Sequence, residues 1–204
     1  MGHREQKKER LRQEIRDVAL ALFRERGFEQ TRVQDVVERV GISEATFFNY
    51  FPTKDAVLND HAATYLDAYR ELLDEELTRT DLTVPDRLRE IADVLAASFS
   101  EDRDFLAATV GRTGLFVGTT GALLDATNEA YERLAELFEQ GQRRGEVRDD
   151  IDGSQLAEIY TGIYIITITN WLTGWWATAT QDLSQRLRAA VEVFLAGAAP
   201  EPEP

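Results

Sequence analysis

Residues 40–58 read VGISEATFFNYFPTKDAVL and gather side chains of two opposite kinds. Four aromatic residues fall at positions 47, 48, 50 and 51, and a lysine follows at position 54. Rings in so short a stretch need a core to cover them. The hydroxyl, amide and ammonium groups among them need polar partners instead. We therefore expect a short element that buries its rings on one side and offers polar groups on the other.

Helix start and stop signals divide this region into short helices. Gly41 can end one helix, and Ser43 can cap the next one. Pro52 interrupts that helix, and Thr53 can cap a long helix that reaches about Thr78. Two short helices joined by a tight turn form a helix-turn-helix, whose second helix enters the major groove of DNA. A helical hairpin used only for packing has the same spacing, and spacing alone leaves both open.

The residues before this region predict the end of a first helix and the start of a second one. Apolar residues recur at helical spacing from Leu11 to Phe23, and Gly27 is placed to end that first helix. Thr31 stands three residues before Gln34, which is a capping-box pattern. The sequence therefore predicts a second, short helix that is capped by Thr31.

The rest of the chain also reads as helices. We expect them at about 85–99, 104–113, 123–145, 152–180 and 182–197. Asp152 with Gln155, and Asp182 with Gln185, repeat the capping-box spacing. The final PEPEP offers nothing to bury, and we expect it to be disordered. No run of strands is evident, so the predicted fold is all-α with about nine helices.

Charge and composition limit the cellular setting and the partners. The chain has no cysteine and a charged N-terminus without an apolar signal segment, which favours the cytoplasm. The net charge of −14 is unevenly spread. Up to Lys54 there are 11 Lys and Arg against 9 Asp and Glu, whereas the rest holds 12 against 28. Such asymmetry indicates a nucleic-acid-binding end on an acidic body, or an ordinary acidic protein that begins with a mixed helix.

The uncharged stretch 159–181 is long enough to suggest a membrane span. Its threonines and Asn170 are costly in lipid, and its three tryptophans do not form two interfacial belts. We expect a helix that is buried on all sides in protein instead. In a chain of 204 residues, this favours an interior surface on one side and a partner subunit on the other.

The N-terminal region resembles the TetR family of transcriptional regulators. The resemblance covers roughly residues 11–58 and rests on the order and spacing of short motifs. These are the Gly27-Phe28 pair, Thr31, the Gly41-Ile42-Ser43 turn, and Tyr50, Phe51 and Lys54 with Leu58 after them. Phe48 departs from the usual tyrosine, and Val37 and Val40 replace the usual alanines.

The resemblance implies a set of DNA-binding residues. Phe47 and Phe51 are expected in the core beneath the recognition helix. Lys54, Tyr50 and Thr31 are expected at phosphates, and Lys54 would share its anion with the backbone N–H groups of a helix start. Residues at the start and on the exposed face of the recognition helix would contact base edges or neighbouring phosphates. These residues are Ser43, Glu44, Ala45, Thr46 and Asn49.

The resemblance also implies a body that binds a ligand and forms a homodimer through its last two helices. Two heads related by a two-fold axis would read a palindromic operator. A small hydrophobic or aromatic ligand would release the repressor from that operator. The candidate pocket residues are Phe99, Phe105, Arg112, Phe116, Tyr160, Tyr164, Thr167, Asn170, Trp171 and Trp175. For each of them simple core packing is the alternative.

The predicted organisation is a DNA-binding head with its N-terminal arm at 1–54, a body at 55–197 and a tail at 198–204. His3 and His61 are the only histidines, and neither has metal-ligand spacing or an evident nucleophile beside it. We therefore expect no enzyme activity, no cofactor and no metal site. A helical protein–protein adaptor that does not bind DNA remains the alternative function.

Overall fold

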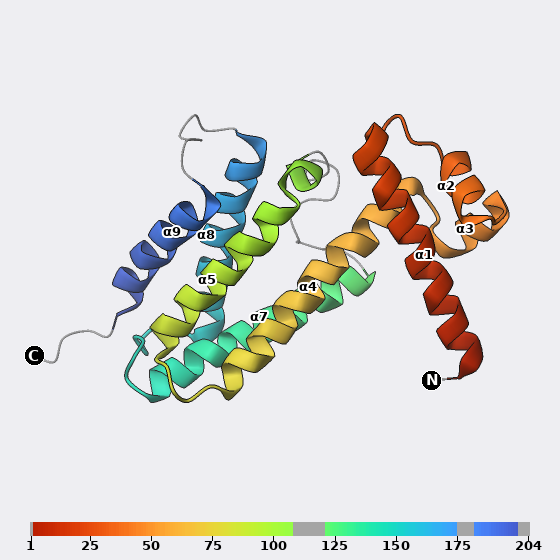
Figure 1. Cartoon of the computed structure of the whole chain (residues 1–204). Coiled ribbons are helices and arrows are strands. Elements are labelled where there is room, and N and C mark those ends of the chain that lie inside the picture. Colours follow the sequence, from red (N-terminus) through yellow and green to blue (C-terminus); the bar gives the residue numbers. More distant parts are fainter. Residues whose placement is uncertain (1, 108–120, 175–181, 200–204) are drawn as a thin grey trace, which may run out of the picture.

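The computed structural model describes residues 2–107, 121–174 and 182–199, and all regular structure within these ranges is helical (Figure 1). In the same ranges, no helix combines the length and the apolar character needed to cross a bilayer. The helices are α1 (His3–Arg26), α2 (Val33–Val40), α3 (Glu44–Tyr50), α4 (Lys54–Thr78), α5 (Val84–Glu101), α7 (Gly121–Arg143), α8 (Gly153–Thr173) and α9 (Leu183–Ala198).

The first three helices and the start of α4 form a head with its own core (Figure 1). Phe47 and Phe51 are fully buried, and their rings lie 5.9 Å apart. They pack among apolar residues of α1 and α2 and against Val57 and Leu58 of α4. The expectation that Phe47 and Phe51 are core residues is confirmed.

The predicted caps around the turn are also confirmed. Gly41 ends α2 in the left-handed conformation, with φ of 81°, which glycine adopts without steric cost. The Ser43 hydroxyl accepts a hydrogen bond from the backbone N–H of Thr46 at 3.1 Å. The Thr53 hydroxyl does the same for Ala56 at 3.1 Å. These caps fix where α3 and α4 begin.

The capping box predicted for Thr31 and Gln34 is wrong. The N-cap of α2 is Arg32, whose backbone N–H donates to the carboxylate of Asp35 at 2.8 Å. The Thr31 hydroxyl instead donates to the carbonyl oxygens of Leu22 and Gly27, at 3.2 and 2.9 Å. Burial decides the outcome, because Thr31 is only 1% exposed and its hydroxyl must find a partner inside the head.

The other helices form a second bundle, the body. α4 packs along α7, α7 packs on α8, and α9 packs against both α5 and α8. α4 belongs to both parts: Val57 and Leu58 lie in the head core, whereas Leu73 lies in the body core. Figure 1 shows α4 as one continuous helix leading from the head into the body.

Two predicted boundaries differ from the structure. The helix expected at 152–180 ends at Thr173, because Gly174 takes the left-handed conformation with φ of 64°. The N-terminal arm is not separate from the first helix, since α1 begins at His3 and continues to Arg26. Residues 200–204 of the expected tail, and most of the expected helix at 104–113, lie outside the described residues.

Candidate nucleic-acid interface and ligand cavity

The outer face of α3 carries the residues expected to read bases. Glu44, Ala45 and Asn49 are exposed, while Phe47 of the same helix is buried beneath them. Phe48 is 46% exposed and packs edge-on against the ring of Phe47. The helix therefore meets solvent with one carboxylate, one methyl and one amide within two turns, which is a face that can enter a groove.

Ser43 and Thr46 form a coupled pair at the start of α3. Their hydroxyl oxygens lie 2.8 Å apart, and either can be the donor. Ser43 is exposed, and Thr46 is half-buried. One hydroxyl therefore orients the other, and the pair can offer its remaining donor or acceptor to DNA.

The Lys54 side chain is hydrogen-bonded within the head. Its Nζ donates to the carbonyl oxygens of Phe28 and Thr31, at 2.6 and 2.9 Å, and lies 4.1 Å from the centre of the Phe28 ring. Burial lowers the pKa of Lys54, against the opposing effect of Asp55. An ammonium has three donors, so at most one remains for the phosphate contact that the sequence predicts.

The other two expected phosphate contacts are also partly covered. Thr31 is buried and its hydroxyl is used within the head, as described above. Tyr50 is half-buried at the end of α3, and its carbonyl oxygen accepts a hydrogen bond from Arg12 at 3.4 Å. That contact leaves the Tyr50 hydroxyl itself unused. Of the three side chains, Tyr50 is therefore the one whose polar group is most available to an anion among the described residues.

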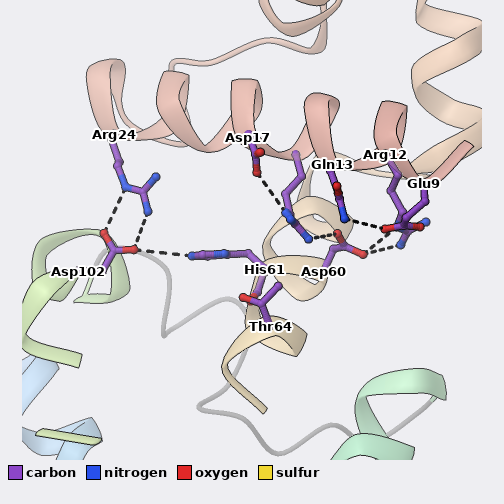
Figure 2. A network of polar contacts seen from close by, with 10 residues as sticks. Glu9, Arg12, Gln13, Asp17, Arg24, Asp60, His61, Thr64 and Asp102 are labelled. Carbon is purple, nitrogen blue, oxygen red and sulfur yellow. Dashed lines mark hydrogen bonds and ion pairs between the residues drawn. The ribbon is translucent and has the colours of Figure 1, made fainter. Parts of the chain in front are cut away.

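Charged side chains join α1 to the rest of the molecule (Figure 2). Arg12 and Arg16 both bind the Asp60 carboxylate of α4, at 2.6 and 3.3 Å. Further along α1, Arg24 binds Asp102, which follows α5, through two nitrogens at 3.2 and 2.6 Å. His61 points at the same carboxylate, with Nε2 3.7 Å from Oδ2. The head is therefore attached to α4 and, separately, to the end of α5.

A cavity of about 120 Å³ lies in the body between α4, α5, α7 and α8. Tyr65 and Tyr69 of α4, Tyr131 of α7 and Tyr164 of α8 line it together with aliphatic residues. Thr127, Ser98 and Thr161 add hydroxyl groups, and no charged side chain is among the described lining residues. An apolar cavity with a few polar groups is the usual form of a small-molecule site.

Of the ligand-binding residues expected from sequence, the structure brings Phe99 and Tyr164 to this cavity. Tyr160 lies one turn before Tyr164, stacked on its ring, and its hydroxyl donates to the Leu88 carbonyl at 3.3 Å. Phe105 instead joins the head core, where its ring lies against His61 and the Arg24 guanidinium.

The remaining expected residues lie elsewhere on α8 or outside the described part. The Thr167 hydroxyl donates to the carbonyl of Ile163 at 2.7 Å. Trp171 is half-buried, and the Cζ atom of Arg103 lies over its ring, 5.0 Å from the ring centre. Asn170 has a buried amide oxygen to which no described group donates. Arg112, Phe116 and Trp175 fall outside the described residues.

Sequence reasoning missed Tyr65, Tyr69 and Tyr131 as lining residues. Tyr65 and Tyr69 are four residues apart, so they share one face of α4. That spacing was a signal that could have been used. The Tyr65 hydroxyl also donates to Asp102 at 3.2 Å, so one side chain touches both the cavity and the carboxylate bound by Arg24.

Comparisons with known proteins agree with this architecture. Residues 15–60 match the family model for bacterial regulatory proteins of the tetR family. The HTH-type transcriptional regulator LuxR of Vibrio harveyi is 24% identical over 153 residues, 74% of each chain. The structure of a TetR-family repressor, FadR of Thermus thermophilus, in complex with lauroyl-CoA, is 25% identical, with a TM-score of 0.71 over 95% of this chain and 97% of that one. The N-terminal region thus matches the tetR family of bacterial regulatory proteins, and the chain resembles a TetR-family repressor in fold along nearly its whole length.

These similarities identify the protein as a DNA-binding transcriptional regulator with a ligand-binding domain. The fold continues to match in more distant structures. RolR in complex with resorcinol is 21% identical, with a TM-score of 0.64 over 97% of this chain and 91% of that one. The FadR and RolR structures hold different ligands, lauroyl-CoA and resorcinol, within one fold.

Proposed function

We propose that this TetR-like protein is a homodimeric repressor that leaves a palindromic operator when a small hydrophobic or aromatic molecule enters the cavity between α4, α5, α7 and α8. The observation that carries the proposal is the position of α4. Its first turns lie in the head core, and Tyr65 and Tyr69 further along line the cavity. A molecule that moves these tyrosines acts on the helix that holds the head.

The exposed face of α3 supports the operator-binding half of the proposal. Glu44, Ala45, Thr46 and Asn49 would approach base edges, and Ser43 and Tyr50 would approach the backbone. The acidic body supports the same arrangement, because an excess of carboxylates repels DNA everywhere except at the head. A regulator that acts on bacterial DNA would work in the cytoplasm.

The outer surfaces of α8 and α9 support the dimer. Ile159 and Ile166 of α8 are 43% and 51% exposed, and Val193 of α9 is 73% exposed. Large aliphatic side chains on two adjacent helices are a natural interface for a second copy. A two-fold axis there would set the two heads at a fixed spacing, and each head would read one half-site.

Fluorescence anisotropy with labelled DNA tests the function. The protein is titrated into the intergenic DNA beside its own gene and into unrelated DNA, at several salt concentrations. We expect tight, salt-sensitive binding to the first DNA only. Equal weak binding to both would place the operator elsewhere, and selection from random DNA would then find it. No binding to any DNA by a folded protein would leave the protein–protein adaptor as the better hypothesis.

A further inference from the structure

One polar atom at the cavity has no partner in the described structure. The Tyr164 hydroxyl is shielded from solvent, and no described group hydrogen-bonds to it. Buried hydroxyl groups are nearly always hydrogen-bonded, because burial without a partner is costly. The same side chain lines the cavity, so a molecule there could supply the missing acceptor.

The electrostatic surroundings of this hydroxyl decide what kind of molecule fits. Burial raises the pKa of Tyr164 well above its ordinary value, and the neighbouring Tyr69 and Tyr160 add to the effect. The hydroxyl therefore keeps its proton and acts as a donor. The described lining also lacks any cation that could neutralise a ligand's negative charge. A carboxylate or phosphate would lose its hydration here without gaining a counterion.

The size of the cavity further limits which molecules can bind there. A dry engineered cavity of about 150 Å³ binds benzene. The present cavity, at about 120 Å³, has room for a molecule built on one ring. Long acyl chains or nucleotide-sized groups exceed this space several-fold.

We propose that the effector is an uncharged molecule of single-ring size with one carbonyl or hydroxyl oxygen, and that Tyr164 donates its hydroxyl hydrogen bond to that oxygen. Tyr164 thereby becomes the residue that selects oxygen-bearing rings over plain hydrocarbons. This inference rests on the proposed function in taking the cavity as the effector site. Beyond that function, it specifies the charge and size of the effector and the residue that hydrogen-bonds to it.

Calorimetric titration of the DNA-free protein with three probes of similar shape tests the proposal. Acetophenone has a ring and a carbonyl oxygen, ethylbenzene lacks the oxygen, and benzoate carries a charge. We expect acetophenone to bind about tenfold more tightly than ethylbenzene, the value of one net hydrogen bond. Benzoate, and the much larger lauroyl-CoA, should bind at least about 100-fold more weakly than acetophenone.

Two tyrosine variants identify the donor. Tyr164→Phe should remove the preference for acetophenone and leave ethylbenzene affinity unchanged, which also shows that the cavity is intact. Tyr160→Phe is the matched control, because that hydroxyl already donates to Leu88. It should keep the tenfold preference.

Several outcomes would overturn the proposal. They are an unchanged preference in Tyr164→Phe, benzoate or lauroyl-CoA binding as tightly as acetophenone, and a lack of binding by any of the probes. Anisotropy with DNA on the same samples separates this inference from the proposed function. Intact probe selectivity without DNA binding defeats only the function, and DNA binding without probe selectivity defeats only the inference.

Discussion

Arg24 of α1 and Asp102, which follows α5, form an ion pair with two parallel contacts, Nε to Oδ1 at 3.2 Å and NH2 to Oδ2 at 2.6 Å. Because Tyr65 donates to the same carboxylate and also lines the cavity, the pair lies between the proposed effector site and the head. The Arg24 side chain is 43% exposed, so the pair itself contributes little stability, about 0–1 kcal/mol.

Arg24→Gln should therefore weaken the coupling between effector and DNA more than it weakens the fold. We expect the effector-induced change in operator Kd to shrink by about 3–10-fold, as it would if about 1 kcal/mol of coupling were lost. Anisotropy with and without effector measures this. Arg133→Gln is the control, because Arg133 pairs with Asp74 inside the body at 2.6 Å. Equal coupling in both variants would exclude a role for the Arg24–Asp102 pair.

His61 should make stability depend on pH. Burial lowers its pKa, and Arg24 and Arg16 act in the same direction, against the attraction of Asp102. A group whose folded pKa is depressed contributes stability that is present above its unfolded pKa, about 6.5, and is lost as pH falls toward the folded value. Urea unfolding at pH 7.5 and 5.5 should show a lower free energy of unfolding at pH 5.5. His61→Gln should reduce that difference, and an undiminished difference would assign it to other groups.

Lys54 offers a direct test of structural against DNA-contact roles. We expect Lys54→Met to lower the free energy of unfolding by about 1–3 kcal/mol, because the carbonyl oxygens of Phe28 and Thr31 lose a charged donor. We also expect the slope of log K against log salt for operator binding to stay unchanged. A slope reduced by about one unit would show that the third donor binds phosphate. Lys7→Met, at an exposed position on α1, controls for the loss of charge.

Asn49 should contribute to sequence preference. Its exposed amide on α3 can pair with adenine, and a good contact of this kind discriminates by about 1–3 kcal/mol. Asn49→Ala should therefore tolerate substitution at one base pair of each half-site while keeping its salt dependence. Titrations against a set of single-base operator variants measure this. A uniform loss of affinity for all variants would instead indicate a backbone contact.

The exposed aliphatic residues of α8 and α9 predict the oligomeric state. Ile166→Asp combined with Val193→Asp should convert the dimer to a monomer, because each change places a charge on the proposed interface. Light scattering checks the mass. Val94→Asp is the control, since Val94 is 51% exposed but lies on α5 and lines the cavity rim. A double variant that remains dimeric would place the interface on another surface.

Helix boundaries in the head were predicted correctly where a single residue decides the local backbone conformation. Gly41, Ser43 and Thr53 act within three or four residues of their own position, and each does what its type predicts. Thr31 is also a hydroxyl residue just before a helix, yet the N-cap of α2 is Arg32. The environment of Thr31 is set by the carbonyls of Leu22 and Gly27 on another element, which sequence spacing does not reveal.

The cavity was harder to predict for the same reason. Tyr164 was correctly expected at the pocket, whereas Tyr160, one turn earlier on α8, donates its hydroxyl hydrogen bond to the Leu88 carbonyl. Tyr65 and Tyr69 stand on a helix that also serves the head, and only the packing of α4 along α7 brings them to Tyr131. Which tyrosines share a cavity depends on helix packing rather than on the periodicity of any one helix.

The uninterrupted course of α4 through 25 residues, from Lys54 to Thr78, has a mechanical consequence. A helix of this length spans about 37 Å. When such a helix tilts as a rigid unit at one end, its other end is displaced. Turning it by roughly 5° about its body end would carry the other end through about 3 Å, close to the rise of two residues. A displacement smaller than one water molecule at the tyrosines could thus become a misfit between the recognition helix and its groove.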